Sequence, residues 1–227
     1  MAIDTGHTRQ KPGATSARGV VEWRFNAVLT AKVAASLKSK GIPAVLLNAD
    51  GDPISLQDRT RQAKEAGATL FISIHHDSVQ PRYLSAWEWE GGKHLYSDMF
   101  HGYGLFVSAL NPAFDESMAV ATRLGDVLLA DGLRPSLHHA ESIAGENRPL
   151  LDASRGIYRF DDLIVLKTAS MPAVLIEAGV IVNRDEELQV MTPDYQAKIV
   201  DAVLNAATDH CTRISASATI TEQNEHE

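Results

Sequence analysis

The sequence is short of cysteine, of positive charge and of long apolar runs, and each shortage excludes a class of protein. Cys211 is the single cysteine of 227 residues, which excludes an intramolecular disulfide framework and a cysteine-rich zinc site. With 21 Lys and Arg against 29 Asp and Glu, the formal net charge of −8 argues against nonspecific nucleic-acid binding. No apolar run is long enough to cross a bilayer. Any bound metal must therefore be held by histidines and carboxylates.

The N-terminus lacks the features of a secretory signal peptide. The first residues, MAIDTGHTRQ, carry neither a basic segment nor an apolar segment of the kind that directs secretion. Residues 2–4 already have the character of a strand, so we expect a trimmed start. A single cysteine is equally compatible with a cytoplasmic and a periplasmic location.

What remains has the composition of an ordinary globular domain, with 44% hydrophobic and 22% charged residues. Apolar, β-favouring runs at 2–4, 43–47 and 69–74 alternate with helical periodicity over 22–40 and 55–66. This order predicts a single-domain α/β fold, with a mostly parallel twisted sheet flanked by helices on both faces.

The second half of the chain is less regular. Its expected elements are a hairpin within 79–101, strands at 103–108, 163–166 and 173–176, and helices at 116–130 and 194–207. Residues 131–161 form a long polar stretch, which indicates a functional loop or lid. Because the last residues have little to bury, we expect a folded domain over 1–211 and a disordered tail over 212–227.

Three predicted strands end in residues that can bind a metal or move a proton. The stretches IDTGH, FISIH and AVLIE end at His7, His75 and Glu177, and Glu22 begins the first helix. Ligands bind at the carboxyl ends of strands in open α/β sheets, so these side chains can converge. Two histidines and a carboxylate are a recurrent ligand set for catalytic zinc, and another carboxylate can act as a base. Spacing alone does not establish the site, since scattered His and Glu residues are common.

The motifs IDTGH, PGA, GVVE, SLQDR, FISIHHDS and MPAVLIEAGVIVN occur in this order between Ile3 and about Asn183. Together they resemble the zinc-dependent N-acetylmuramoyl-L-alanine amidases of the amidase-3 type. The resemblance implies one zinc ion per chain, held by His7, Glu22 and His75, with Glu177 as the catalytic carboxylate. It also implies the substrate, which is the amide between the lactyl group of N-acetylmuramic acid and L-alanine in peptidoglycan.

The chain departs from the family pattern at a few positions, and none of them is a proposed ligand. Thr5 stands where family members often have Pro, and His76 and Asp77 stand where a small or an amide residue is frequent. The resemblance implies a location in the periplasm or cell envelope. We expect a monomer that acts on peptidoglycan, and an activator protein is a further partner to consider.

Four more residues are candidates for support of the site or for substrate contact. Asp4 can orient a histidine ligand, and Arg59 can bond the rim of the site or form a surface salt bridge. His76 should point away from His75, because successive side chains of a strand alternate, and we expect it to pack or to hydrogen-bond. Asn183 is expected to fix a turn after the last strand.

The segment LHHAE contains His138, His139 and Glu141 at a spacing typical of metal ligands. No strand end fixes them, so we expect a solvated loop. An alternative is that this loop folds over the zinc, with Glu141 or Glu146 occupying the open position and restraining activity.

Two rival functions remain open. One is a zinc amidase of the same fold that acts on soluble muropeptides instead of intact wall. The other is a non-catalytic regulator that binds the wall, although such a protein would be expected to have lost a ligand or the base, and all four residues are present.

Overall fold

The computed structural model describes the backbone of residues 1–224 and the side chains of residues 1–216. The strands are β1 Ala2–Thr5, β2 Val45–Leu47, β3 Phe71–Asp77, β4 Ser85–Trp89, β5 Gly92–Tyr96, β6 Gly104–Val107, β7 Leu150–Asp152, β8 Ile157–Arg159 and β9 Ala173–Val180. The α-helices are α1 Glu22–Ser39, α2 Leu56–Glu65, α3 Phe114–Ala130, α4 Ile164–Thr168, α5 Glu186–Gln189 and α6 Pro193–Asn224. Short 3-10 helices lie at η1 Pro81–Tyr83 and η2 His138–Ala140.

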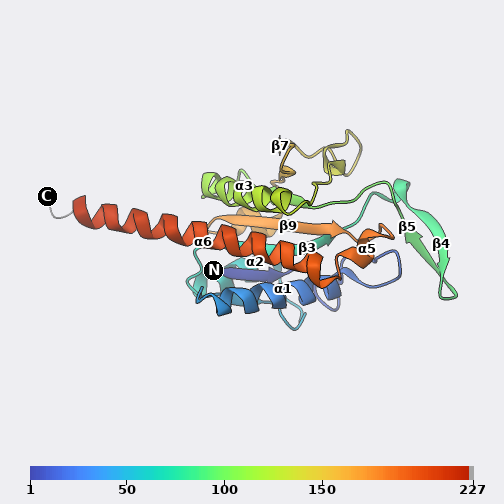
Figure 1. The fold of residues 1–227 in the computed structure, drawn as a ribbon, viewed down its shortest axis with the longest axis horizontal. Helices are drawn as coiled ribbons and strands as arrows, with labels where there is room; N and C mark the ends of the chain where they lie inside the picture. Colours follow the sequence, from blue (N-terminus) through green and yellow to red (C-terminus); the bar gives the residue numbers. More distant parts are fainter. Residues whose placement is uncertain (225–227) are drawn as a thin grey trace.

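A seven-stranded sheet in the order β2-β1-β3-β9-β6-β8-β7 forms the centre of the fold. The pairs β1–β2, β1–β3, β3–β9 and β6–β8 are parallel, and the pairs β6–β9 and β7–β8 are antiparallel. The predicted α/β class and mostly parallel sheet are confirmed. The hairpin predicted within 79–101 is the separate pair β4–β5, which extends from one end of the molecule (Figure 1).

Helices cover both faces of the sheet, because the central strands bury side chains on both sides. Ile72 and Ile74 of β3 lie in a core shared with α1, α3 and α6, whereas Phe71 lies in a second core shared with α2 and α4. Because successive side chains of a strand point to opposite faces, β3 contributes residues to the hydrophobic layers on both sides of the sheet. The layers fix β1, β3 and β9 side by side, so their carboxyl ends form one edge.

Residues 163–166, predicted as a strand, instead form the start of α4, and this prediction was wrong. The run Leu-Ile-Val-Leu is apolar enough for either state, and a short buried run has no period that separates strand from helix. Val165 and Leu166 are buried in the core that α4 shares with α2.

The polar stretch 131–161 is more structured than a loop. It contains η2, β7 and β8, and Ile157 and Tyr158 of β8 are buried where this strand pairs with β6.

The last helix is longer than predicted, since α6 continues past residue 207 and through Asn224. The segment from Asp194 to Glu227 contains neither Gly nor Pro, so the chain offers no strong stop signal after the apolar pattern fades. Most of the predicted disordered tail over 212–227 is therefore helical in backbone, and residues 225–227 lie outside the described residues.

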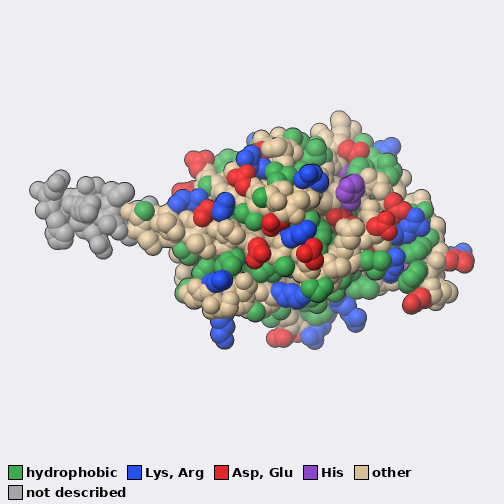
Figure 2. Space-filling model, viewed as in Figure 1, with side chains coloured by type: hydrophobic (Ala, Val, Ile, Leu, Met, Phe, Trp, Pro, Cys, Tyr) green, Lys and Arg blue, Asp and Glu red, His purple; other side chains and the backbone are tan. Residues whose placement is uncertain are grey.

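Acidic and basic side chains are intermixed with apolar ones over the face seen in Figure 2, with no continuous basic field in that view. This pattern agrees with the charge argument against nucleic-acid binding. Within the described part of the chain, no helix combines the length and the apolar character needed to cross a membrane.

The two-layer core predicts a contrast between buried and exposed aliphatic positions. Ile72→Ala should lower the free energy of unfolding by about 2–5 kcal/mol, because Ile72 is fully buried and its loss leaves a cavity. Leu110→Ala, at a position that is 61% exposed, should change it by less than about 0.5 kcal/mol. Urea unfolding of both variants measures the difference, and equal losses would contradict the assignment of the core.

Candidate metal centre

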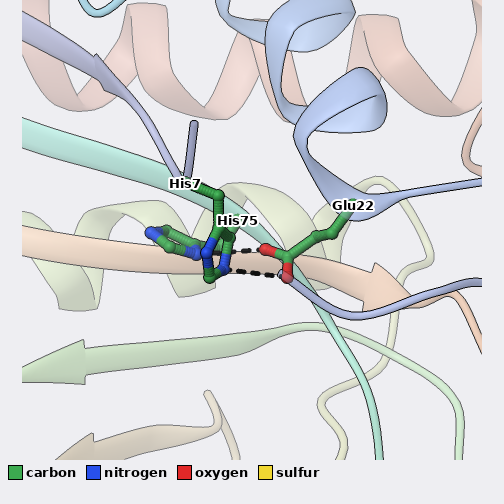
Figure 3. Close-up of side chains that lie close together, drawn as sticks. All are labelled: His7, Glu22 and His75. Carbon is green, nitrogen blue, oxygen red and sulfur yellow. Dashed lines mark hydrogen bonds and ion pairs between the residues drawn. The ribbon is translucent and has the colours of Figure 1, made fainter. Parts of the chain in front are cut away.

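The side chains of His7, Glu22 and His75 converge at the carboxyl edge of the sheet (Figure 3). His7 follows the end of β1, His75 lies near the end of β3, and Glu22 is the first residue of α1. Glu22 Oε2 lies 2.9 Å from His7 Nε2, and Glu22 Oε1 lies 3.1 Å from His75 Nδ1. The three side chains can offer two imidazole nitrogens and one carboxylate to a single ion.

The carboxylate of Glu22 is held by donors from two other segments and from its own helix. It accepts hydrogen bonds from the backbone N–H of Ala14 at 3.0 Å, from the backbone N–H of His76 at 3.2 Å and from Asn26 Nδ2 at 3.1 Å. Burial alone would raise the pKa of Glu22, but hydrogen bonds with His7 and His75 outweigh it and hold the pKa well below its usual value. Glu22 is therefore a fixed anion.

Asn26 was missed by sequence reasoning. It lies one helical turn after Glu22, and besides the Glu22 bond its Nδ2 donates to the carbonyl of Gly6 at 3.2 Å. The sequence did contain a signal for it. Glu22 and Asn26 are four residues apart on the predicted first helix, and residues at that spacing lie on the same face of a helix.

The backbone of His7 is in the left-handed region, with φ of 65°, a conformation that costs a non-glycine residue of the order of 1–3 kcal/mol. Its carbonyl accepts hydrogen bonds from Arg59 Nη2 at 2.8 Å and from the amide of Asn48. These two donors offset the strain and fix the direction in which the imidazole leaves the chain.

Arg59 is only 2% exposed, so the surface salt bridge considered for it does not occur. Its guanidinium donates to Asp4 Oδ1 at 2.7 Å and to the carbonyl of Thr5 at 2.6 Å. Asp4 is also buried and accepts a hydrogen bond from Ser73 Oγ at 2.8 Å. Burial raises the pKa of Asp4, and Arg59 opposes that shift. Asp4 thus orients Arg59, and its influence on His7 passes through Arg59.

At Gly6 and Gly13 the backbone passes so close to His7, Glu22 and His75 that only glycine fits. A Cβ at Gly13 would lie 2.2 Å from Glu22 Oε2 and 2.5 Å from His7 Cδ2, and the φ of Gly13 is +80°. A Cβ at Gly6 would lie 2.5 Å from His75 Nε2. The motifs TGH and PGA are thereby explained by close approach of backbone to the site.

Glu177 lies on β9 directly opposite His75 on β3. Its Oε2 is buried and has no hydrogen-bond partner among the residues that the structure describes. Burial, and then the charges of Asp77 and Glu22, raise the pKa of Glu177 well above its usual value. A carboxyl group in this state binds a proton readily and lies next to the candidate metal ligands.

A cavity of about 430 Å³ opens beside the two histidines. His7 and His75 form part of its wall, and Ile164 and Val165 of α4 form an apolar part. Lys11 lines it as well. A substrate in this cavity would have the candidate metal centre at its side.

His76 points away from His75, as strand alternation predicts. Its Nδ1 lies 2.8 Å from Asn26 Oδ1, and its ring packs on Phe25. Burial lowers the pKa of His76 to about 4. The ring therefore stays neutral and supports Asn26.

Asn183 fixes the turn after β9. Its Oδ1 accepts from the backbone N–H groups of Asp185 and Glu186 at 3.0 Å each, and its Nδ2 donates to the carbonyl of Phe100 at 3.0 Å. These contacts are structural: they fix the segment that follows Glu177 and tie it to Phe100.

The expectation of a solvated loop at LHHAE was wrong. His138 is 2% exposed, and the rings of His138 and His139 lie against Phe100 and Phe106, respectively. His138, His139 and Asp77 form a second group of side chains that could hold a metal ion. Burial alone would lower the pKa of His139, but Asp77 and Glu146 outweigh it and raise this pKa to about 9.

The two carboxylates considered as blocking groups have other partners. Glu146 accepts a hydrogen bond from Gln80 Nε2 at 2.7 Å, and its Oε2 lies 2.8 Å from His139 Nδ1. The carboxylate of Glu141 lies near the hydroxyl of Tyr83, whose pKa is raised first by burial and then by Glu141, although Glu141 Oε2 has no hydrogen-bond partner among the described residues. These contacts give no support to a blocking role for either residue.

The fold and the site together define an α/β protein with a candidate metal centre at the carboxyl edge of its sheet. The sequence model of the N-acetylmuramoyl-L-alanine amidases matches residues 1–209, and the chain belongs to this family. A curated relative, N-acetylmuramoyl-L-alanine amidase AmiA of Salmonella typhimurium, is 28% identical over 212 residues, which cover 90% of this chain and 73% of the relative. These findings confirm the predicted enzyme class.

Solved structures of amidases share the fold. N-acetylmuramoyl-L-alanine amidase AmiC2 of Nostoc punctiforme superposes with a TM-score of 0.68 at 24% identity, over 93% of this chain and 96% of that one. The CwlD amidase of Clostridioides difficile, solved in complex with the GerS lipoprotein, gives 0.68 at 19% identity, over 93% and 97% of the two chains.

A pair of glycine substitutions tests the close approach at Gly13. Gly13→Ala and Gly41→Ala both place a Cβ at positive φ, which should cost each variant about 1–2 kcal/mol of unfolding free energy, and Gly13→Ala should cost more because its Cβ would lie 2.2 Å from Glu22 Oε2. Only Gly13→Ala should also weaken metal binding, by about tenfold to a hundredfold, because nothing lies within 4 Å of the new Cβ at Gly41. Zinc titration of the folded variants measures this, and equal affinities would contradict the account.

Proposed function

We propose that this amidase hydrolyses the bond between the lactyl group of N-acetylmuramic acid and L-alanine in peptidoglycan, with one zinc ion held by His7, Glu22 and His75. The observation that carries the proposal is the convergence of two imidazole nitrogens on the Glu22 carboxylate, beside the unpaired buried oxygen of Glu177. In this proposal Glu177 is the general acid–base.

The donor set suits zinc. Two nitrogens and one carboxylate oxygen are a recurrent set in catalytic zinc sites, which keep one further position open. Glu22 is kept anionic, and its carboxylate keeps backbone and amide donors while it faces the histidines. Held in this way, the three side chains already converge, and they would need to move apart only slightly to receive the ion.

The reaction would use the chain's own groups as follows. When bound, zinc would polarise the amide carbonyl and lower the pKa of a water molecule. Glu177 would accept the proton of the attacking water and pass it to the alanine nitrogen as the carbon–nitrogen bond breaks. Its raised pKa suits it to hold that proton between the two steps. The products are a free lactyl carboxylate and a free peptide amine.

The cavity beside the histidines supports binding of a substrate with polar and apolar parts. Ile164 and Val165 can pack against its aliphatic groups, and Lys11 can attract a carboxylate of the stem peptide. The same cavity would accept a soluble muropeptide, so that rival is retained as a substrate alternative. A non-catalytic regulator is disfavoured, because such a protein would be expected to have lost a ligand or the base, and the chain keeps all four residues proposed for these roles.

Location and partners follow from the substrate. An enzyme that cuts peptidoglycan acts in the cell envelope, and we propose the periplasm or the wall. The CwlD amidase was solved with a lipoprotein partner, which supports an activator protein for this chain as well. We propose that the chain itself works as a monomer.

Metal removal and a single substitution test the proposal together. The purified chain should contain about one zinc in the site of His7, and chelation should abolish release of peptide from sacculi. Glu177→Gln should keep that zinc and lower kcat by about 10²–10⁴-fold, because it removes the proton carrier. Glu116→Gln, the same change at an exposed position, should leave kcat unaltered. Hydrolysis that survives both chelation and Glu177→Gln would refute the mechanism.

The pH profile tests the role of Glu177 separately. Activity needs Glu177 ionised, so it should fall as the pH drops through the pKa of this group. Because burial raises that pKa, the acid limb of kcat/KM should lie above 4.5, the usual value for a glutamate. A limb at or below 4.5 in the range where the chain stays folded would exclude Glu177 as the base.

A further inference from the structure

A second cluster of side chains lies beyond the end of β3, formed by Asp77, His138 and His139. Asp77 is the last residue of β3, two positions after His75, and the two histidines lie in η2. Asp77 Oδ2 lies 2.7 Å from His139 Nε2 and 3.3 Å from His138 Nε2. Two imidazole nitrogens thus converge on one carboxylate oxygen.

The other ring nitrogen of each histidine is held from outside the cluster. Ser136 Oγ lies 2.8 Å from His138 Nδ1, and Glu146 Oε2 lies 2.8 Å from His139 Nδ1. Gln80 in turn donates to Glu146 at 2.7 Å. Metal-bound histidines are commonly oriented in this way by an oxygen acceptor on the nitrogen that does not bind the ion.

His138 Nε2 provides an independent observation. The residue is 2% exposed, and its Nε2 forms no hydrogen bond of good geometry among the described residues, although Asp77 Oδ2 lies 3.3 Å away and the backbone of Ser78 interacts with the ring. A buried polar atom without a hydrogen-bond partner destabilises the folded state. An ion between His138, His139 and Asp77 would satisfy it.

We propose that Asp77, His138 and His139 bind a second divalent metal ion of the zinc class, at a site that shares no ligand with the centre of His7, Glu22 and His75. The three ligand atoms lie within 4.8 Å of one another. Two nitrogens and a carboxylate oxygen suit zinc, with a fourth position open to water.

The surroundings fit a site that excludes bulk water. Phe100 packs on the ring of His138 at a centroid distance of 5.1 Å, and Phe106 packs on the ring of His139 at 5.0 Å. An ion here would join the η2 segment to the end of β3, next to the strand position of His75. Its role is to anchor residues 138–146 against the catalytic edge.

The competing state is an ion pair without metal. In that state a protonated His139 donates one hydrogen bond to Asp77 and one to Glu146. The Nε2 of His138 is then left without a hydrogen bond of good geometry. The two states differ in metal content and in the response of His138 to substitution. Both differences can be measured without an activity assay.

The test uses the full chain, stripped of metal and refilled with zinc alone or with cobalt(II) alone. Metal per chain is measured by elemental analysis after gel filtration, and the cobalt(II) absorption that is lost in each variant is assigned to the site which that variant removes. The variants are His138→Asn and His139→Gln in the second cluster, Glu22→Gln in the first, and the pair His139→Gln with Glu22→Gln. His210→Gln is the control, because His210 is a buried histidine elsewhere that bonds the carbonyl of Thr69.

The wild type and His210→Gln should bind about two zinc ions per chain, each single variant of either site about one, and the combined variant none. One ion in the wild type that disappears in Glu22→Gln would overturn the second site and uphold the first. One ion that disappears only in His138→Asn or His139→Gln would uphold the second site and overturn the first. Thermal unfolding checks each variant; should His139→Gln fail to fold, His138→Asn carries the comparison.

Discussion

The carboxylate of Glu22 is the point on which the candidate catalytic edge depends. It links α1 to both histidines, to the PGA turn through Ala14 and to β3 through the backbone of His76. A buried anion is expensive unless donors surround it, and these donors come from segments far apart in the sequence. The sheet order is what brings them together, because β1 and β3 are neighbours and α1 follows β1. Fold and site therefore stabilise each other.

Arg59 provides the second constraint. Its guanidinium donates hydrogen bonds both to the carbonyl of His7, whose backbone is strained, and to the carboxylate of Asp4 in β1. The position of the His7 imidazole is therefore fixed relative to the sheet. Glu177, the proposed general base, is arranged differently. Glu177 is left without a partner on an otherwise apolar strand, and that isolation, costly for stability, is what prepares it to carry a proton.

The sequence predicted the first half of the fold well, since strands and helices there carry clean periods and clear helix ends such as Gly41 and Gly67. It failed at residues 163–166, where four apolar residues have no period, and at the end of α6, where no stop signal exists. His7, His75 and Glu177 near the strand ends, and Glu22 at the start of α1, were proposed from motifs, and the structure brings them to one edge of the sheet. Asn26 and the burial of His138 and His139 were missed, because they depend on contacts between segments that no local pattern records.

The most direct test of the central claim is a crystal structure of the zinc-loaded chain with anomalous diffraction measured on both sides of the zinc edge. Zinc in the proposed site should give an anomalous peak bonded to a ring nitrogen of His7, a ring nitrogen of His75 and the Glu22 carboxylate, at about 2.0–2.2 Å from each. A fully loaded crystal with no peak between these three side chains would contradict the account, whatever metal it contained elsewhere.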